Sequence, residues 1–408
     1  MAQNGPGDDQ GGGREAASAR AARRAAERAA RQAANRAERQ ARRAARQAER
    51  AGRRGADAEE DRAEAGGLSG GQHHPPPAAA TRPFNILLVG QGMRLGGQAA
   101  LFAASLRRNA HGWRGRLIVA EPQPEGAWSG AQTRMPEAAR AALAAFGAEI
   151  LPFTATHFGA GYPYGNKIEA LALLPPGEPF VFFDSDTLVT GPLERLSLDF
   201  ARPSASMRRS ATWPEPPPYG PGYGAIWKSL YDRFGLDYES SLDRSQPDEH
   251  WERYLYFNAG WFFGADPQEF GRRFLDWALA IRDDPGEALA CQSLDPWLDQ
   301  VALPLVIHSL GGGRPGPELA GLDGWATCHY RNLSLLYARE SDAVVALIEE
   351  LAADPRIAPL LADDEAARHL IAEGAGRSRI RPLFAGEDPP PTEKAMRQRL
   401  RRAGLWFR

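Results

Sequence analysis

The chain has 408 residues, with 49 Lys and Arg against 51 Asp and Glu, a net charge of −2 at neutral pH. The first 80 residues hold fifteen Arg and eleven acidic residues, which leaves the rest of the chain with a net charge of −6. An acidic body argues against broad nucleic-acid binding by the folded part, and no apolar run is long enough to span a membrane. Cys291 and Cys328 make no disulfide framework, so we expect a soluble protein in a reducing, cytoplasmic compartment.

The first 80 residues predict no globular domain, because Met1 and Leu68 are their only large apolar side chains and burial cannot offset the entropy of ordering them. Glutamates recur there every eleven residues, close to three helical turns, at Glu27, Glu38 and Glu49. With many Ala and Arg, this pattern indicates a solvated or partly disordered helix over about 15–51, followed by a linker at 66–80. An electrostatic arm for anionic lipid or nucleic acid is the alternative hypothesis.

Strand and helix signals alternate from residue 81 onward, which predicts an α/β domain with a mainly parallel sheet. Short apolar runs predict strands at 85–90, 116–121, 149–153 and 180–183. Helical spacing predicts helices at 97–108, 136–146 and 166–174. Ligands of such sheets bind at the carboxyl ends of the strands, where Gly90, Glu121 and Asp184 stand.

The segment 202–250 is rich in Pro, Gly and Tyr, which is typical of a functional lid or binding loop. Its aromatic residues are candidates either for an acceptor platform or for packing: Trp213, Tyr219, Tyr223 and Trp227. The sequence then predicts a strand at 254–264, helices at 267–282 and 296–302, and a strand at 303–308. We divide the chain into a tail and linker (1–80), a catalytic-sized domain (81–340) and a helical extension (341–408).

The most specific local feature is Asp184-Ser185-Asp186, which follows four bulky apolar residues. Alternate side chains of an extended chain share one face, so Asp184 and Asp186 can converge on one ion. Two carboxylates at the end of a buried strand are costly unless a cation or donors compensate them. Oxygen ligands suit Mg²⁺ or Mn²⁺, which usually bridge substrate phosphates. We expect a metal site here; the alternative is an acidic loop that caps the next turn.

A glycine-rich turn at the end of the first strand indicates a nucleotide site. Gly90-Gln91-Gly92 precedes a helix and Glu121 ends the next strand, as in dinucleotide fingerprints where glycines admit a pyrophosphate and an acid binds the ribose. The spacing is GxGxxxG rather than GxGxxG. A nucleotide-sugar enzyme would use the same strand ends, so this feature leaves both an NAD-dependent oxidoreductase and a nucleotide-sugar enzyme open.

Several short motifs occur in a fixed order, at residues 105–107, 166–171, 180–189, 256–260, 299–300 and 329–330. This order resembles GT-A nucleotide-sugar glycosyltransferases, most of all the family-8 group of glycogenin and the lipopolysaccharide galactosyltransferases. The resemblance spans about residues 84–337. It implies a Rossmann-like GT-A domain that transfers a sugar from a nucleotide-diphosphate sugar, with a UDP-sugar as the expected donor, to a glycan, lipid or other acceptor.

Carried over position by position, the resemblance implies that Asp184, Asp186 and His329 bind Mn²⁺ or Mg²⁺. Asn258 would lie beside the donor sugar, with Asp299 and Gln300 near its anomeric carbon. The expected donor contacts at the strand ends and upstream of the aspartates are Gly90, Gln91, Gly92, Glu121, Lys167 and Ser185.

Each of these residues also has an ordinary structural interpretation. Asp299 suits a helix cap, Asn258 a turn and Lys167 a helix surface. His308 competes with His329 as the third ligand, because it ends a predicted strand. Asp299 is a candidate either for stabilising an oxocarbenium-like sugar or for general base catalysis of an inverting attack.

Three functions remain open from the sequence: a metal-dependent glycosyltransferase, an NAD-dependent oxidoreductase and a non-catalytic binding protein with a degenerate transferase domain. We expect the first, without a specific nucleic-acid partner. The basic, partly apolar end at 394–408 suits either docking onto the domain or peripheral association with the anionic inner face of the membrane.

Overall fold

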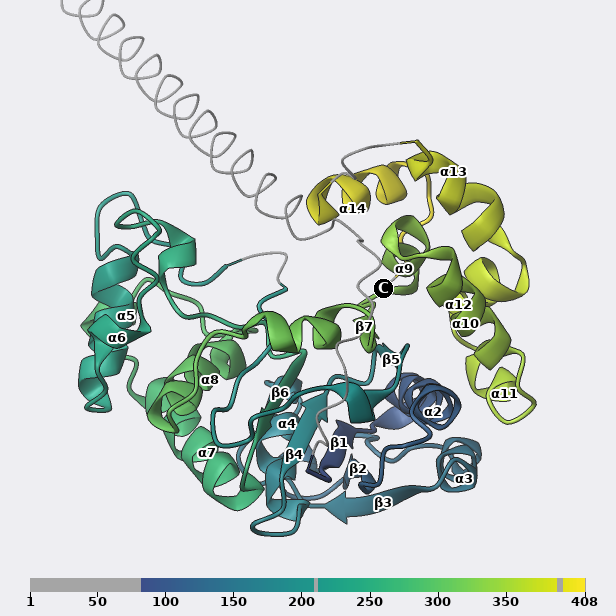
Figure 1. The fold of residues 1–408 in the computed structure, drawn as a ribbon, viewed down its shortest axis with the longest axis horizontal. Coiled ribbons are helices and arrows are strands. Elements are labelled where there is room, and N and C mark those ends of the chain that lie inside the picture. The colour runs from purple at the N-terminus through teal and green to yellow at the C-terminus, as the bar shows by residue number, and fades with distance from the viewer. Residues whose placement is uncertain (1–81, 209–211, 387–391, 408) are drawn as a thin grey trace, which may run out of the picture. The chain divides into compact units, whose positions relative to one another are not determined.

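The computed structural model describes residues 82–208, 212–386 and 392–407 (Figure 1). The chain divides into two units, Met1–Gly70 and Gly71–Arg408. Every described residue belongs to the second unit. The predicted tail helix and linker therefore lie outside the described residues.

A five-stranded sheet forms the centre of the second unit, in the order β3-β2-β1-β4-β6. Its strands are β1 (Asn85–Val89), β2 (Leu117–Pro122), β3 (Ala148–Phe153), β4 (Phe180–Phe183) and β6 (Trp261–Gly264). The first four are parallel, and β6 runs antiparallel to β4. The predicted α/β fold with a mainly parallel sheet is confirmed, and all four strands expected before residue 184 are present.

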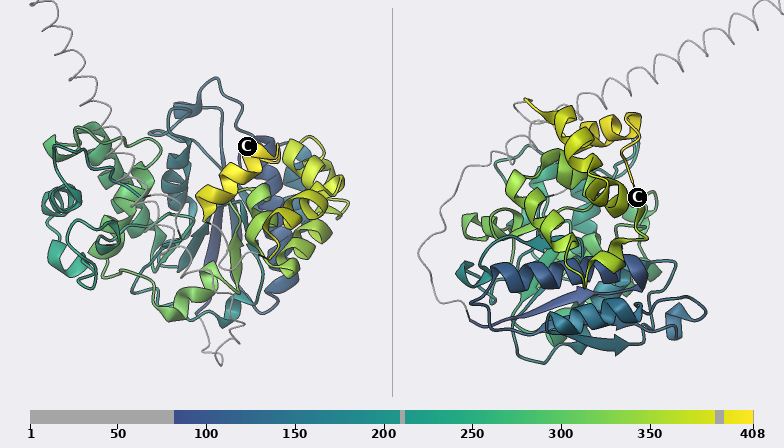
Figure 2. Two further views of the ribbon diagram at one scale, coloured as in Figure 1. Left: turned by 90° about the horizontal axis from the view of Figure 1, so that it is seen from above. Right: turned by 90° about the vertical axis from the view of Figure 1, so that its right-hand side faces the viewer.

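Helices cover both faces of this sheet because its strands are apolar on both sides. On one face lie α2 (Gly92–Asn109) and α3 (Glu137–Ala145), and on the other lie α4 (Asn166–Glu169), α7 (Pro267–Asp283) and α8 (Leu298–Ser309). In β1, Ile86 and Leu88 lie in the buried apolar cluster on the α2 face, and Leu87 lies in the cluster on the opposite face. This alternation is the two-residue period of a strand. Figure 2 shows α2, in blue, lying along the strands.

A second, two-stranded sheet continues from the carboxyl end of β4. It consists of β5 (Thr187–Val189) and β7 (Thr327–His329), which are antiparallel with Thr187 opposite His329. This pairing brings the end of β7 beside the chain that leaves β4.

The predicted strand at 303–308 is wrong, because residues 298–309 form the single helix α8 with Pro304 inside it. Nearly all of its apolar side chains are buried. A continuous apolar run does not distinguish a buried helix from a buried strand, and the helix predicted at 296–302 is the first half of the same element. Within 254–264, only the last four residues are strand.

The proline-rich segment 202–250 is not irregular throughout. It contains the helices α5 (Tyr223–Arg233) and α6 (Tyr238–Ser241). Trp213 and Trp227 are buried, and their rings meet edge to face with centroids 5.3 Å apart. Tyr219, by contrast, is 97% exposed. The two tryptophans therefore pack this segment against the core and do not form an acceptor platform.

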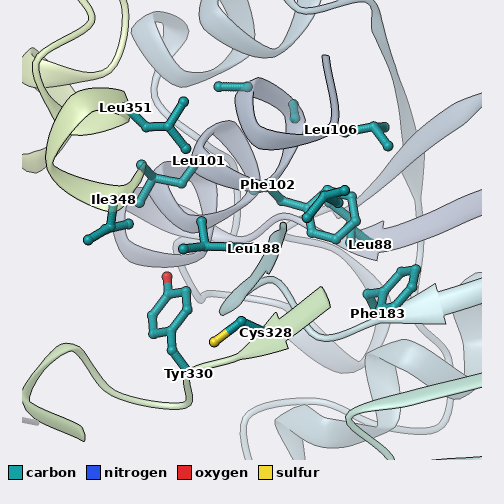
Figure 3. Close-up of a cluster of buried hydrophobic side chains, with 14 of the residues drawn as sticks. Leu88, Leu101, Phe102, Leu106, Phe183, Leu188, Cys328, Tyr330, Ile348 and Leu351 are labelled. Carbon is teal, nitrogen blue, oxygen red and sulfur yellow. The ribbon is translucent and has the colours of Figure 1, made fainter. Parts of the chain in front are cut away.

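The chain after β7 is mainly helical. Its helices are α9 (Leu333–Arg339), α10 (Asp342–Ala352), α11 (Ala358–Leu361), α12 (Glu365–Ala367), α13 (Arg381–Phe384) and α14 (Glu393–Arg402). Ile348 and Leu351 of α10 share a buried cluster with Leu101 of α2 (Figure 3). Met396 and Leu400 of α14 are buried in the same cluster, so the C-terminal helices dock onto the body. Among the described helices, none combines the length and apolarity that crossing a membrane requires.

Candidate active site

Three potential metal ligands converge where β4 and β7 end. One ligand atom each from Asp184, Asp186 and His329 lies within 4.8 Å of the others. His329 Nε2 is 3.1 Å from Asp186 Oδ1 and 3.9 Å from Asp184 Oδ2. The rival candidate, His308, lies in the last turn of α8, where its Nε2 is 3.2 Å from Ser240 Oγ. The aspartate pair therefore meets His329 and not His308.

The backbone before β6 allows this close approach. The Asp184 N–H donates to the carbonyl oxygen of Gly260 at 2.9 Å, and Ala259 has a positive φ of 56°. A Cβ at position 260 would overlap the His329 ring, so the glycine lets the imidazole lie against the main chain. Asn258 Oδ1 accepts a hydrogen bond from the Gly260 N–H at 2.6 Å and stabilises the turn.

Two neighbouring carboxylates that are only 29% and 22% exposed, Asp184 and Asp186, are electrostatically unfavourable without a cation. Burial raises the pKa of Asp184, and Lys167 and His329 offset part of that rise. Burial also acts to raise the pKa of Asp186, but the adjacent His329, a backbone hydrogen bond and Lys167 together outweigh it and the pKa is lowered. Carboxylate oxygens suit Mg²⁺ and Mn²⁺, and a histidine nitrogen can complete the set. The donor set therefore fits a divalent cation, whose charge would compensate two neighbouring carboxylates.

Lys167 links this partly exposed pair to a third carboxylate, Asp299, which is buried. Its Nζ lies 2.9 Å from Asp184 Oδ1 and 3.4 Å from Asp299 Oδ2, and it donates to the carbonyl oxygen of Ala259 at 3.3 Å. Burial acts to lower the pKa of Lys167, but Asp184 and Asp299 outweigh it and the pKa is raised. The side chain is only 8% exposed, so Lys167 is a fixed positive charge between two carboxylates and not a surface helix residue.

Asp299 is held by Tyr162, a residue that the sequence did not single out. The Tyr162 hydroxyl lies 2.8 Å from Asp299 Oδ1 and accepts the Asp299 N–H at 2.8 Å. Burial and the negative charge of Asp299 raise the pKa of Tyr162, so the hydroxyl keeps its proton and can donate to the carboxylate. Because the two residues are 137 positions apart, no local sequence pattern reveals the contact.

The other residues expected near the donor sugar have defined partners. Gln300 Oε1 accepts from the Tyr256 hydroxyl at 2.8 Å. Asn258 Nδ2 donates to the carbonyl oxygen of Arg208. Ser185, between the two aspartates, has its Oγ 3.2 Å from Gln98 Oε1.

The glycine-rich turn after β1 starts α2. Gly92 has a φ of 58°, which glycine adopts at little cost. Gln91 Oε1 accepts from Asn166 Nδ2 at 3.0 Å, next to the bridging lysine. Gly90 is buried, and a Cβ there would overlap the sulfur of Met135. The turn is thus packed against the protein at Gly90 and is partly exposed at Gln91 and Gly92.

Glu121, the acid expected to bind a ribose, is 1% exposed and contacts the chain around α3. Its Oε1 accepts the Met135 N–H at 2.8 Å, and its Oε2 lies 2.6 Å from Arg140 NH1. Both carboxylate oxygens therefore already hold parts of the protein together.

Residues 86–311, more than half of the chain, match the Rhodobacterales glycosyltransferase domain. The chain belongs to this glycosyltransferase family. No curated protein matches the sequence significantly. Among solved structures, the galactosyltransferase LgtC in complex with donor and acceptor sugar analogues is 16% identical, with a TM-score of 0.39 over 67% of this chain and 98% of that chain. The bifunctional glycosyltransferase WbbM is 13% identical, with a TM-score of 0.39 over 70% of this chain and 52% of that chain.

These identities and TM-scores are low, so the assignment as a glycosyltransferase rests on the family match. This match confirms the predicted enzyme class, a glycosyltransferase. It also sets aside the oxidoreductase alternative, in agreement with the structural contacts of Glu121.

The glycosyltransferase has a partly buried network of charged side chains next to its candidate metal ligands, which the sequence did not predict. Its members are Arg208, Arg331, Arg339, Glu340, Glu393 and Arg397. Burial acts to raise the pKa of Glu393, but Arg331, Arg339 and Arg397 together outweigh it and the pKa is lowered. In a chain with 49 Lys and Arg, nearly all of them Arg, these arginines carry no distinguishing sequence signal.

Proposed function

We propose that the protein transfers a sugar from a nucleotide-diphosphate sugar, with a UDP-sugar as donor, to a glycan or lipid acceptor, and that transfer depends on Mn²⁺ or Mg²⁺. The observation that supports this most strongly is the convergence of Asp184, Asp186 and His329 in a member of a glycosyltransferase family. The carboxyl ends of strands are where such sheets bind ligands, and these cations usually bridge substrate phosphates.

A cation held by these three side chains would neutralise the donor diphosphate and the charge that develops on the leaving nucleoside diphosphate. Lys167 binds Asp184 Oδ1, while Oδ2 of the same carboxylate is the oxygen nearer His329. Lys167 thereby orients Asp184 and adds a positive charge beside the leaving group.

We assign the sugar side of the site to Asn258, Asp299 and Gln300. An oxygen near the anomeric carbon stabilises the positive charge that develops there, as carboxylates do in glycoside hydrolysis. Asp299 is 2% exposed and held by Lys167 and Tyr162, whereas Gln300 is less buried. Gln300 is therefore the residue to contact the sugar directly, with Asp299 as a fixed negative charge behind it and Asn258 shaping the turn.

Gln91, Gly92 and Ser185 are the proposed nucleotide contacts, because they lie at the ends of β1 and β4. Gly90 and Glu121 act indirectly: the glycine admits Met135, and the glutamate holds the same segment through the Met135 N–H.

Thermal-shift titration with UDP-, GDP- and TDP-sugars tests the donor class, because a ligand that binds the folded state stabilises it by mass action. We expect UDP-sugars to raise the Tm in MnCl₂ or MgCl₂ and to have little effect after EDTA treatment. A Tm that responds to none of the three nucleotide classes in either metal would refute the proposed donor.

We further propose that the enzyme works in the cytoplasm and meets its acceptor at an anionic membrane surface through α14. Lys394, Arg401 and Arg402 are exposed on this helix, whereas Met396 and Leu400 face the core. Each basic side chain near an anionic surface contributes about 1 kcal/mol. Wild-type protein should sediment with phosphatidylserine vesicles, whereas a variant with all three residues replaced by Glu should stay in the supernatant. Phosphatidylcholine vesicles are the control. Equal sedimentation of variant and wild type would count against this surface.

A further inference from the structure

Glu393, at the start of α14, is buried among three arginines. Its Oε2 lies 2.7 Å from Arg339 NH1 and 3.1 Å from Arg331 NH1, and its Oε1 accepts from Arg397 NH2. The side chain is 8% exposed. A carboxylate in this position neutralises guanidinium groups that would otherwise be buried without compensation. The helix is therefore anchored at its first residue by charge.

Two of these arginines continue to the candidate metal ligands. Arg339 NH2 donates to the carbonyl oxygen of His329 at 3.3 Å. Arg331 NH2 donates to the carbonyl oxygen of Arg208, which also accepts from Asn258 Nδ2. Asn258 in turn stabilises the turn that lies against the His329 ring. Glu393 is therefore connected to the backbone of His329 through Arg339, and to the turn beside its ring through Arg331.

The chain beyond α14 is fixed to the same stretch that follows β7. Asn332 Nδ2 donates to the carbonyl oxygen of Phe407 at 2.6 Å, and Ser334 Oγ donates to that of Leu405 at 2.7 Å. Leu405 is buried in the large apolar cluster. Both ends of the α14 segment are thus attached to the residues just after His329.

We propose that α14 is a positioning element of the metal site, in which Glu393 holds the end of β7 so that His329 faces the two aspartates. The inference rests on the proposed metal-dependent transfer. Glu393 acts through Arg331 and Arg339, and it is a positioning residue. Removing groups that orient metal ligands typically weakens metal affinity by about 10- to 100-fold.

Titration of the purified full-length protein with MnCl₂, followed by the electron paramagnetic resonance signal of free Mn²⁺, tests this role. For Glu393→Gln we expect a Kd for Mn²⁺ weaker by about 10- to 100-fold, at a temperature where its circular dichroism matches the wild type. Glu373→Gln is the matched control, because this exposed carboxylate of the same helical region pairs with His369 at 2.8 Å. Its Kd should equal that of the wild type.

The double variant Glu393→Gln with Arg397→Gln separates positioning from stability. Removing Arg397 as well restores the net charge of the network, so the Tm should recover. Arg331 and Arg339 still lack their carboxylate, so the binding of Mn²⁺ should remain as weak as in Glu393→Gln. If Glu393→Gln does not fold, the double variant decides. A folded variant that binds Mn²⁺ as tightly as the wild type overturns the inference. Wild-type protein that binds neither Mn²⁺ nor Mg²⁺ would overturn the metal-dependent function itself.

Discussion

The aspartates and the histidine of the candidate metal site come from two regions held together by different forces. The aspartates follow β4, whose side chains are buried in apolar clusters on both faces of the sheet. His329 ends β7, which is tied to the C-terminal helices by hydrogen bonds and buried ion pairs. The stability lost when a buried apolar side chain is shortened grows with the volume removed. Loss of either partner of a buried ion pair, by contrast, leaves the other charge buried without compensation. The geometry of the histidine region therefore depends on single charges at several positions: Arg331, Arg339 and Glu393.

The largest effect is expected at Lys167, where the aspartate region also depends on charge. Lys167→Met keeps the apolar stem but leaves Asp184 and Asp299 without their shared cation. Loss of one partner of a buried pair costs about 3–5 kcal/mol, and urea unfolding should show a drop of this size. Lys228→Met is the matched control, because the Lys228–Asp232 pair lies on the surface, where a pair contributes about 0–1 kcal/mol. Equal losses in both variants would contradict the bridging role.

A smaller loss, in activity and not in folding, is expected for Asp186→Asn. This change removes a ligand charge and leaves β4 packed, so kcat/KM for UDP release from a UDP-sugar should fall on the order of 10²- to 10³-fold with an unchanged circular dichroism spectrum. Asp232→Asn, at an exposed carboxylate, should have no effect. Activity of Asp186→Asn at the wild-type level, insensitive to EDTA, would remove this aspartate from the reaction.

Gly260→Ala tests the junction between the two regions. The added Cβ overlaps the His329 ring, and overpacking of this kind costs about 1–3 kcal/mol. We expect a lower Tm together with weaker Mn²⁺ binding, because the ring must move away from the aspartates. Gly313→Ala is the control, since a Cβ there meets open space. Identical behaviour of the two alanine variants would show that the close approach is not needed.

The smallest effect is expected for Ile348→Val, which removes one methylene group from the apolar contact between α10 and α2. One buried methylene contributes about 0.5–1.5 kcal/mol to stability, so the Tm should be slightly lower than that of the wild type. The Kd for Mn²⁺ should not change, because no residue of the charge network lies on α10 or α2. A loss of Mn²⁺ affinity comparable to that of Glu393→Gln would mean that general loosening of the C-terminal helices, and not charge, controls the site.

Sequence reasoning succeeded where the structural signal is local. The apolar runs before Gly90 and Asp184 predicted β1 and β4, because a buried strand needs consecutive apolar residues. The same rule failed at 303–308, where an equally apolar run lies in the buried helix α8. The three-residue strands β5 and β7 are too short to show a period, and their pairing depends on distant segments.

The candidate site likewise contains residues that the sequence predicted and residues that it did not. The order of short motifs was sufficient to expect Asp184, Asp186 and His329 together, as they are in the structure. Tyr162 and Glu393 could not be expected, because each acts on a partner far away in the chain and belongs to a common residue type. Their roles follow from burial and distance, which a single sequence does not contain.

The attachment of Glu393 has a consequence for how the enzyme is made. At a synthesis rate of about 5–20 residues per second, α14 follows the aspartate pair by on the order of ten to forty seconds. During that interval the nascent chain has its acidic residues but lacks the contacts that hold the histidine against them. Newly synthesised enzyme should therefore gain its full affinity for metal only after α14 has been translated and has docked, which delays sugar transfer until this helix has left the ribosome.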